Sequence, residues 1–223
     1  MFFPPFLLLF LFGFIFLLFF TFALVQFGLF AWAFSRLGIP PEYLFSFMFL
    51  CIVGSMVNIP LRKIRLENKP EDWEIIHFYG MRFRPPRWAN PQEMVLAVNL
   101  GGAILPTCLS IYLLSHAENP VRMLLALAIV TYVVYRMARP ISGVGIGTPM
   151  FIPPILAALS AMLINPHWAA PTAYVAGTLG TLIGADILHL GDLKHLNAPV
   201  ASIGGAGTFD GIFLTGILAV LLS

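Results

Sequence analysis

The chain contains apolar segments that are too long and too free of charge for an ordinary soluble domain. Residues 6–34 hold no Asp, Glu, Lys or Arg, and about 20 such residues suffice for a membrane-spanning helix. No Lys or Arg precedes this run, and it is longer than the apolar core of a signal peptide. In the whole chain 59% of the residues are hydrophobic and 10% are charged, against about 45–50% and about 25% in soluble domains. The sequence therefore predicts an integral membrane protein.

Seven segments have the composition of membrane helices, which predicts an all-α integral membrane bundle forming a single domain, residues 1–223. The spans are predicted over residues 6–34, 43–59, 94–115, 120–137, 149–165, 168–190 and 209–222. The fifth and seventh are short, because about 15 helical residues extend only about 22 Å, less than the hydrocarbon thickness of about 30 Å. Residues 60–93 mix aromatic and basic residues, which favours a cytoplasmic segment on the membrane interface. Within them, Met81 and Phe83 flank Arg82 with the alternation of a strand.

Basic residues are distributed unequally between the two sides that seven spans define. Ten of the 12 Lys and Arg residues fall in the connections after the second, fourth and sixth spans, and only Arg36 and Arg122 fall on the other side. Cytoplasmic connections of membrane proteins are enriched in Lys and Arg. We therefore expect a multi-pass protein of the inner (cytoplasmic) membrane, with its N-terminus in the cytoplasm and its C-terminus outside.

The pattern Gly-x-Gly-Thr occurs twice, sixty positions apart, each time before a short span. The residues of the two copies, which we predict to bind substrate, are Gly145, Gly147, Thr148, Gly205, Gly207 and Thr208. We interpret residues 120–165 and 168–222 as a parallel repeat, in which a re-entrant glycine-rich stretch leads into a short helix. The alternative is that the small residues only allow close helix packing, which we expect for Gly177, Gly180 and Gly184.

Two acidic residues, Asp186 and Asp210, are predicted within the spans at the same cytoplasmic end of the bundle. An ionisable residue inside a membrane segment is expensive and indicates function by default. Two carboxylates that share a proton can activate water and protonate a leaving amine, and the same pair can serve a proton relay or a cation site. The structural alternatives are a helix-capping role for Asp210 and a pairing with a cation for Asp186.

A second, weaker hypothesis is a metal site near the end of the sixth span. Asp186, His189, Asp192 and His195 recur every three residues, and residues three apart lie on adjoining faces of a helix. Gly191 is expected to interrupt the helix before all four align. We therefore predict no metal and no cofactor, and keep this set as the alternative.

The C-terminal third resembles a family of uncharacterised prokaryotic multi-spanning membrane proteins. The likeness runs from Gly184-Ala185-Asp186 to the segment between Gly204 and Gly211. The same residues are loosely similar to the GxGD-type intramembrane aspartyl proteases, the presenilin and prepilin-peptidase group. That resemblance implies two aspartates on consecutive spans joined by a cytoplasmic connection, an arrangement that Asp186 and Asp210 fit.

Three functions remain open from the sequence. The first is an intramembrane aspartyl hydrolase with Asp186 and Asp210 as the catalytic pair. The second is an ion- or proton-coupled transporter or channel with its site between the two glycine-rich stretches, and the third is a non-catalytic membrane scaffold. The expected partners are the lipid bilayer and a membrane peptide or small ion. The net charge of +2 argues against a nucleic acid.

Overall fold

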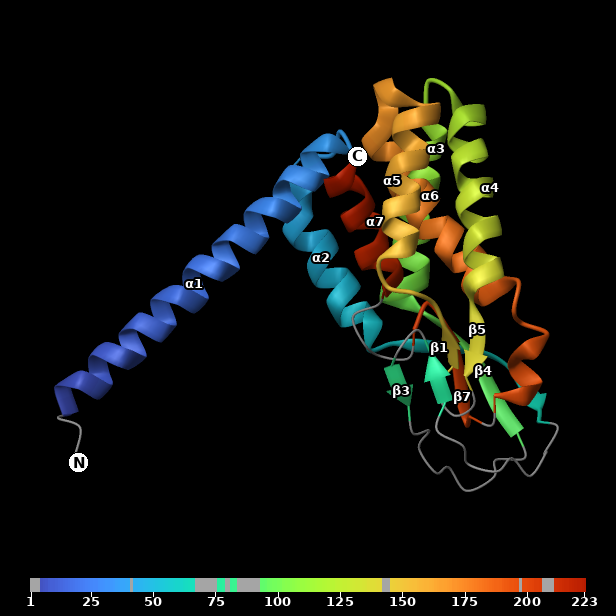
Figure 1. The fold of residues 1–223 in the computed structure, drawn as a ribbon, viewed down its shortest axis with the longest axis horizontal. Helices are drawn as coiled ribbons and strands as arrows, with labels where there is room; N and C mark the ends of the chain where they lie inside the picture. The colour runs from blue at the N-terminus through green and yellow to red at the C-terminus, as the bar shows by residue number, and fades with distance from the viewer. Residues whose placement is uncertain are drawn as a thin grey trace.

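Helices form the larger body of the molecule, and short strands gather at one end of it (Figure 1). This computed structural model describes residues 5–40, 42–66, 76–78, 81–83, 93–141, 145–196, 198–205 and 211–223. In this part of the chain there are seven α-helices. Their bounds are α1 Pro5–Arg36, α2 Glu42–Ser55, α3 Leu105–Ser115, α4 Pro120–Met137, α5 Ile152–Ile164, α6 Ala169–Thr181 and α7 Gly211–Leu222. The expectation of a mainly helical protein with seven helices is confirmed.

Short helical turns of other types extend or connect these helices. Two are π-helical, η1 (Leu100–Ile104) before α3 and η3 (Leu182–Ile187) after α6. Two are 3-10 turns, η2 (Pro166–Trp168) and η4 (Asp192–His195). The predicted sixth span is therefore α-helical only as far as Thr181 and changes its winding before Asp186.

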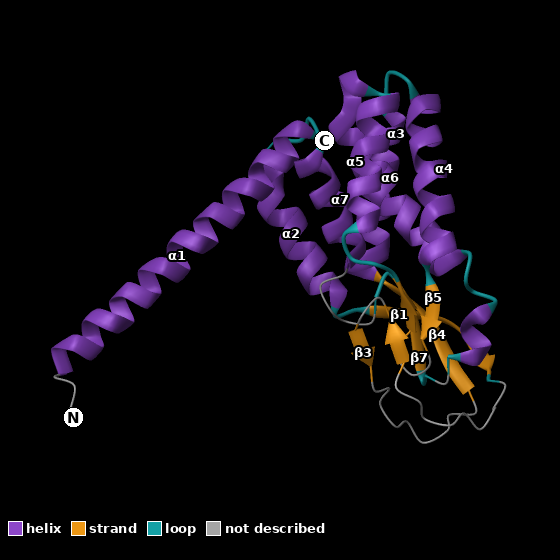
Figure 2. Ribbon diagram, viewed as in Figure 1, coloured by secondary structure: helices purple, strands orange, loops and turns teal. Residues whose placement is uncertain are grey.

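The prediction of an all-α protein is wrong, because strands lie at one end of the bundle (Figure 2). A three-stranded sheet has the order β1-β4-β7, and two hairpins pair β2 with β3 and β5 with β6. The strands are β1 Asn58–Arg65, β2 Ile76–Phe78, β3 Met81–Phe83, β4 Glu93–Asn99, β5 Arg139–Ile141, β6 Gly145–Gly147 and β7 Val200–Ile203. The first glycine-rich stretch thus contributes a strand, β6, and the second follows β7.

The strand β4 explains most of this error. Its apolar residues run directly into η1 and α3, so the sequence reads as one helix from residue 94 onward. Periodicity cannot distinguish a short buried strand from a buried helix. β4 pairs antiparallel with β1 and parallel with β7. Since β4 has partners on both sides, its backbone groups are satisfied as a strand.

The centre of the bundle is α6, whose residues are almost all buried between α3, α4, α5 and α7. Glycines allow the close approach of α4, as expected. A Cβ on Gly180 would lie 2.7 Å from Val130 Cγ1, and one on Gly184 would lie 2.7 Å from the carbonyl oxygen of Thr131. Small residues at such contacts let helix backbones pack tightly without a large apolar side chain between them.

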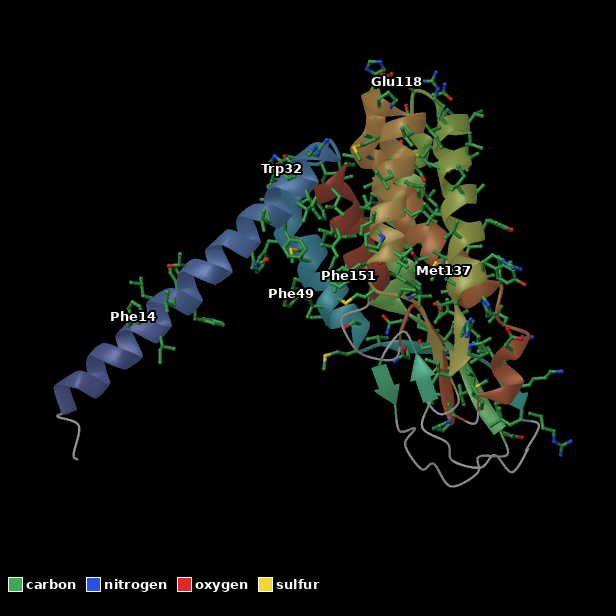
Figure 3. The ribbon with its side chains drawn as sticks, in the orientation of Figure 1. Phe14, Trp32, Phe49, Glu118, Met137 and Phe151 are labelled. Carbon is green, nitrogen blue, oxygen red and sulfur yellow. The ribbon has the colours of Figure 1, made fainter. Side chains whose placement is uncertain are left out.

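The helices alternate in direction, so that the long connections lie at the strand end of the bundle. Glu118, in the short connection before α4, lies at the opposite end from the strands, while Met137 lies toward them (Figure 3). The connections from α2 to α3, from α4 to α5 and from α6 to α7 all carry the strands. We call this the sheet end of the molecule.

Two of the described helical segments are long and apolar enough to cross a membrane, Phe14–Arg36 and Pro120–Met137. α1 extends away from the bundle, and Phe14 stands clear of the other helices (Figure 3). Shorter apolar helical segments are Phe45–Ser55, Leu100–Ser115 and Ile152–Ile164. Their outward faces carry exposed large side chains, including Phe49 and Ile111. This composition agrees with a protein associated with a membrane.

Candidate functional site

Asp186 lies near the sheet end of the bundle, in the π-helical segment η3. Its side chain is half-buried, and its Oδ2 accepts a hydrogen bond of 2.8 Å from the backbone N–H of Gly204. Gly204 directly follows β7. The contact therefore joins the end of the sixth predicted span to the second glycine-rich stretch, and it orients the carboxylate.

Gly204 can make this contact only because it has no side chain. Its φ is +81°, in the left-handed region that favours glycine. A Cβ at this position would also lie 2.6 Å from the backbone nitrogen of Ala103 in η1. The backbone of β7 thus reaches η1 on one side and the Asp186 carboxylate on the other.

A cavity of about 290 Å³ lies between η3, α7 and the two glycine-rich stretches. Asp186 lines it, together with Gly145 and Thr148 from the first stretch and Gly205 from the second. Most of the remaining wall is apolar. Ligand pockets are typically apolar concavities of about 300–1,000 Å³ with a few convergent polar groups, so this cavity has the character of a small ligand site.

The two Gly-x-Gly-Thr copies are only partly comparable in the structure. Their first glycines, Gly145 and Gly205, both have positive φ, +133° and +89°, and both line the cavity. Their strand partners differ, since β6 pairs with β5 whereas β7 pairs with β4. Gly147 ends β6 and does not line the cavity. The parallel repeat stays a prediction.

Three predicted site residues lie outside the described residues: Gly207, Thr208 and Asp210. The segment that contains them is bracketed by Gly205 and Ile212. Both of these flanking residues line the cavity beside Asp186.

A polar cluster that reaches the cavity through Ser202 was not predicted from the sequence. The amide of Asn99, which is 1% exposed, donates to the Asn58 side-chain oxygen at 3.0 Å and to the Ser55 carbonyl at 2.7 Å. Its own oxygen accepts from the backbone N–H of Gly102 at 2.7 Å. The Ser202 hydroxyl, from β7, donates to the same Asn58 oxygen at 2.6 Å. The cluster ties β7, and hence the approach to Gly204, to β1 and η1.

Threonine hydroxyls were also missed. Thr181 and Thr215, each 5% exposed, line the cavity from α6 and α7. Among the described residues the Thr181 hydroxyl has no hydrogen-bond partner. Threonine is common in membrane helices, so composition alone carries no signal for such a role.

The alternative metal site is not assembled by the described side chains. His189 is buried, and its Nδ1 donates to the carbonyl oxygen of Gly184 at 3.0 Å, while its ring packs against Tyr135 at 4.9 Å between centroids. In the described part of the chain no three His, Cys, Asp or Glu residues are close enough to hold a metal ion. The side chain of His195 lies outside that part. His189 is thus a buried, hydrogen-bonded histidine that supports the helix end.

Comparison with known proteins identifies one family. Residues 52–222 match the family model described as "Protein of unknown function (DUF1614)". The chain belongs to the DUF1614 family. The DUF1614 match includes every described strand, the cavity and α3–α7, and it leaves out α1. The expected resemblance to an uncharacterised protein family is thereby confirmed.

No curated protein and no solved structure matches this DUF1614 chain. The similarity to GxGD-type proteases is consequently unsupported by these comparisons, and it rests on the positions of Asp186 and Asp210 in the sequence alone. Any activity has to be argued from the site itself.

Proposed function

We propose that this DUF1614 protein is an intramembrane aspartyl hydrolase, with the cavity beside Asp186 as its active site and Asp186 and Asp210 as its catalytic pair. The observation that carries the proposal is the position of Asp186 in the wall of a mainly apolar cavity. Gly205 and Ile212, which flank the segment holding Asp210, line the same cavity. An acidic side chain in such surroundings, within an apolar bundle, is the usual mark of a functional site.

The proposal includes a membrane placement with seven spans. α5 and α7 have 13 and 12 residues, so they extend only about 18–20 Å of a hydrocarbon thickness of about 30 Å. In this placement the glycine-rich stretches before them enter the membrane as re-entrant segments. Their backbone polar groups then bond to neighbouring protein or to water in the cavity. The basic residues at the sheet end favour a cytoplasmic location for that end and for the N-terminus, with the C-terminus outside the inner membrane.

The reaction we propose is hydrolysis of a peptide bond with one proton shared by the two aspartates. The ionised carboxylate takes a proton from water as the water oxygen bonds to the carbonyl carbon, and the protonated carboxyl gives its proton to the carbonyl oxygen. The resulting gem-diol returns a hydroxyl proton to the aspartate that protonated the carbonyl oxygen. The aspartate that took a proton from water then protonates the amine nitrogen as the carbon–nitrogen bond breaks. One water is consumed, and both aspartates regain their starting states.

The strands suggest how a substrate would lie. Within the described residues, β7 and β6 each have a strand partner on one side only, and both line the cavity. A free strand edge can bind an extended peptide through main-chain hydrogen bonds. We propose that an unwound segment of an apolar membrane peptide binds along one of these edges, with its carbonyl carbon opposite Asp186.

The proposal is tested with purified full-length protein and a mixture of membrane-spanning peptides that carry a fluorophore and a quencher at opposite ends. We expect cleavage by the unmodified protein and a loss of at least about 100-fold in Asp186→Asn and Asp210→Asn, because each variant removes one of the two acid–base groups. Asp192→Asn is the control, since Asp192 does not line the cavity. Full cleavage by either catalytic-pair variant would sink the proposal, and tolerance of Ala at both positions would favour a scaffold.

Transport is the second candidate, and one observation favours it. The cavity lies between the two glycine-rich stretches and contains a carboxylate, as a cation or proton site would. The test is ion or proton flux in proteoliposomes. Flux that requires Asp186, tolerates Asp210→Asn and occurs without peptide cleavage would replace the hydrolase proposal with this one.

A further inference from the structure

The hydroxyl of Thr181 is a polar group of the cavity that neither the fold nor the predicted site explains. Thr181 is 5% exposed and lines the cavity. Its Oγ1 forms no hydrogen bond with any described residue. Burying a hydroxyl without a hydrogen-bond partner is unfavourable, so a ligand that bonds to it from the cavity is favoured.

The π-helical turn η3 brings Thr181 and Asp186 to the same cavity. Five residues apart on an α-helix, their side chains would point about 140° away from each other around the axis. The hydrogen bonds of a π-helix link residues five apart, so such residues lie on the same side of the helix. Thr181 is the residue before η3 and Asp186 lies within it, and both line the cavity.

We propose that Thr181 and Asp186 together bind a water molecule in the cavity wall. The threonine hydroxyl bonds to the water from one side, and the carboxylate accepts a proton of the water from the other. A carboxylate has about four acceptor sites, so it can accept a bond from water in addition to the contacts it makes within the fold. This inference rests on the proposed function: the bound water is the one that hydrolysis consumes. Thr181 is a further catalytic residue, because its hydroxyl holds that water for attack.

Thr178 provides a matched control on the same helix. Its hydroxyl is also fully buried and lies beside the Tyr174 hydroxyl, yet it does not line the cavity. It faces α7 at Gly216, where an added Cβ would overlap it. This interface is too tightly packed to admit water, so the two threonines differ mainly in their access to the cavity.

The test compares the isosteric variants Thr181→Val and Thr178→Val in the full-length protein by thermal unfolding. We expect Thr181→Val to lower the unfolding midpoint by about 2–4 °C, because it removes a hydrogen bond to the bound water. Thr178→Val should leave the midpoint nearly unchanged or raise it, because Thr178 does not line the cavity and binds no water there. A rise in the midpoint of Thr181→Val equal to that of Thr178→Val would overturn the proposal.

Kinetics of peptide cleavage give the second readout. Thr181→Val should lower kcat at least 10-fold with KM changed less than twofold, and Thr181→Ser, which keeps the hydroxyl, should restore most of kcat. If Thr181→Ser loses as much stability as Thr181→Val, the role of Thr181 is packing and the proposal is wrong. If no variant of Asp186 or Asp210 affects cleavage but the two Val variants still shift in opposite directions, the water site stands and the hydrolase proposal fails.

Discussion

At the scale of single residues, the position of the Asp186 carboxylate depends on Gly204. The backbone N–H of Gly204 is a hydrogen-bond donor to that carboxylate, and its φ is positive. Its Cα hydrogen faces the backbone of Ala103, where a methyl group would collide. One glycine therefore connects η1, β7 and the proposed catalytic group.

We expect Gly204→Ala to lower the free energy of unfolding by about 2–4 kcal/mol, from the strained φ and the collision with η1 together. The displaced backbone would also lose its bond to Asp186, so cleavage should fall with stability. Gly191→Ala is the control, since Gly191 has a φ of −67° and open space around its Cα. Thermal unfolding in detergent measures both variants, and an unfolding midpoint for Gly204→Ala equal to that of Gly191→Ala would contradict this account.

At the scale of elements, the two π-helical turns determine which contacts are made at the start of α3 and at the end of α6. η3 turns Asp186 toward the cavity, and η1 lets the chain pass from β4 into α3 while touching α2. The contact with α2 is made by backbone on backbone. A Cβ on Gly101 would overlap the Cys51 carbonyl oxygen, and one on Gly54 would lie 3.0 Å from the Gly101 nitrogen.

We predict that Gly101→Ala separates α2 from η1 and lowers the free energy of unfolding by about 3 kcal/mol, because neither backbone can yield to the added methyl group. Gly28→Ala in α1 is the matched control. Gly28 has nothing within 4 Å of an added Cβ, and alanine favours a helix more than glycine does. Its unfolding midpoint should stay the same or rise. Equal midpoints for the two variants would show that this close approach is absent in the protein.

At the scale of the whole molecule, the strands, the cavity and most described basic residues lie at one end of the helices. Lys63 and Glu93 form an exposed pair on that sheet end, 3.6 Å apart, and Glu118 lies at the opposite end (Figure 3). Seven alternating helices with an N-terminus in the cytoplasm would put the sheet end in the cytoplasm as well.

Labelling of single cysteines tests this orientation. In a chain without Cys51 and Cys108, a membrane-impermeant maleimide should label Glu118→Cys from outside intact cells. It should label Lys63→Cys, whose native side chain is 74% exposed, only in inverted vesicles. Labelling of both positions from the same side, or in the reverse order, would contradict the proposed orientation.

The helical body could be predicted from local sequence because long apolar runs allow few alternatives. The run 6–34 became α1, and the run 120–137 became α4 with Asn119 capping Arg122 and Pro120 in its first turn. A helix satisfies the hydrogen-bonding groups of its own backbone, so such runs form helices whatever surrounds them. Local sequence was also enough to identify Asp186, Gly145, Thr148 and Gly205 as candidate site residues. An acidic residue or a Gly-x-Gly-Thr pattern within an apolar stretch is unusual by itself.

The strands and the remaining site residues were decided by tertiary structure. β4 is a strand because it pairs with β1, whose partner residues lie 28–41 positions away, and with β7, whose partner residues lie 105 positions away. Asn58, Asn99 and Ser202 form one hydrogen-bonded cluster only after that sheet has formed. Thr181 and Asp186 both line the cavity because η3 is wound as a π-helix. In the same segment, Gly184 packs closely against the backbone of α4. Hydrophobic sequence thus determined where helices form, whereas long-range pairing and packing decided which polar groups meet at the cavity.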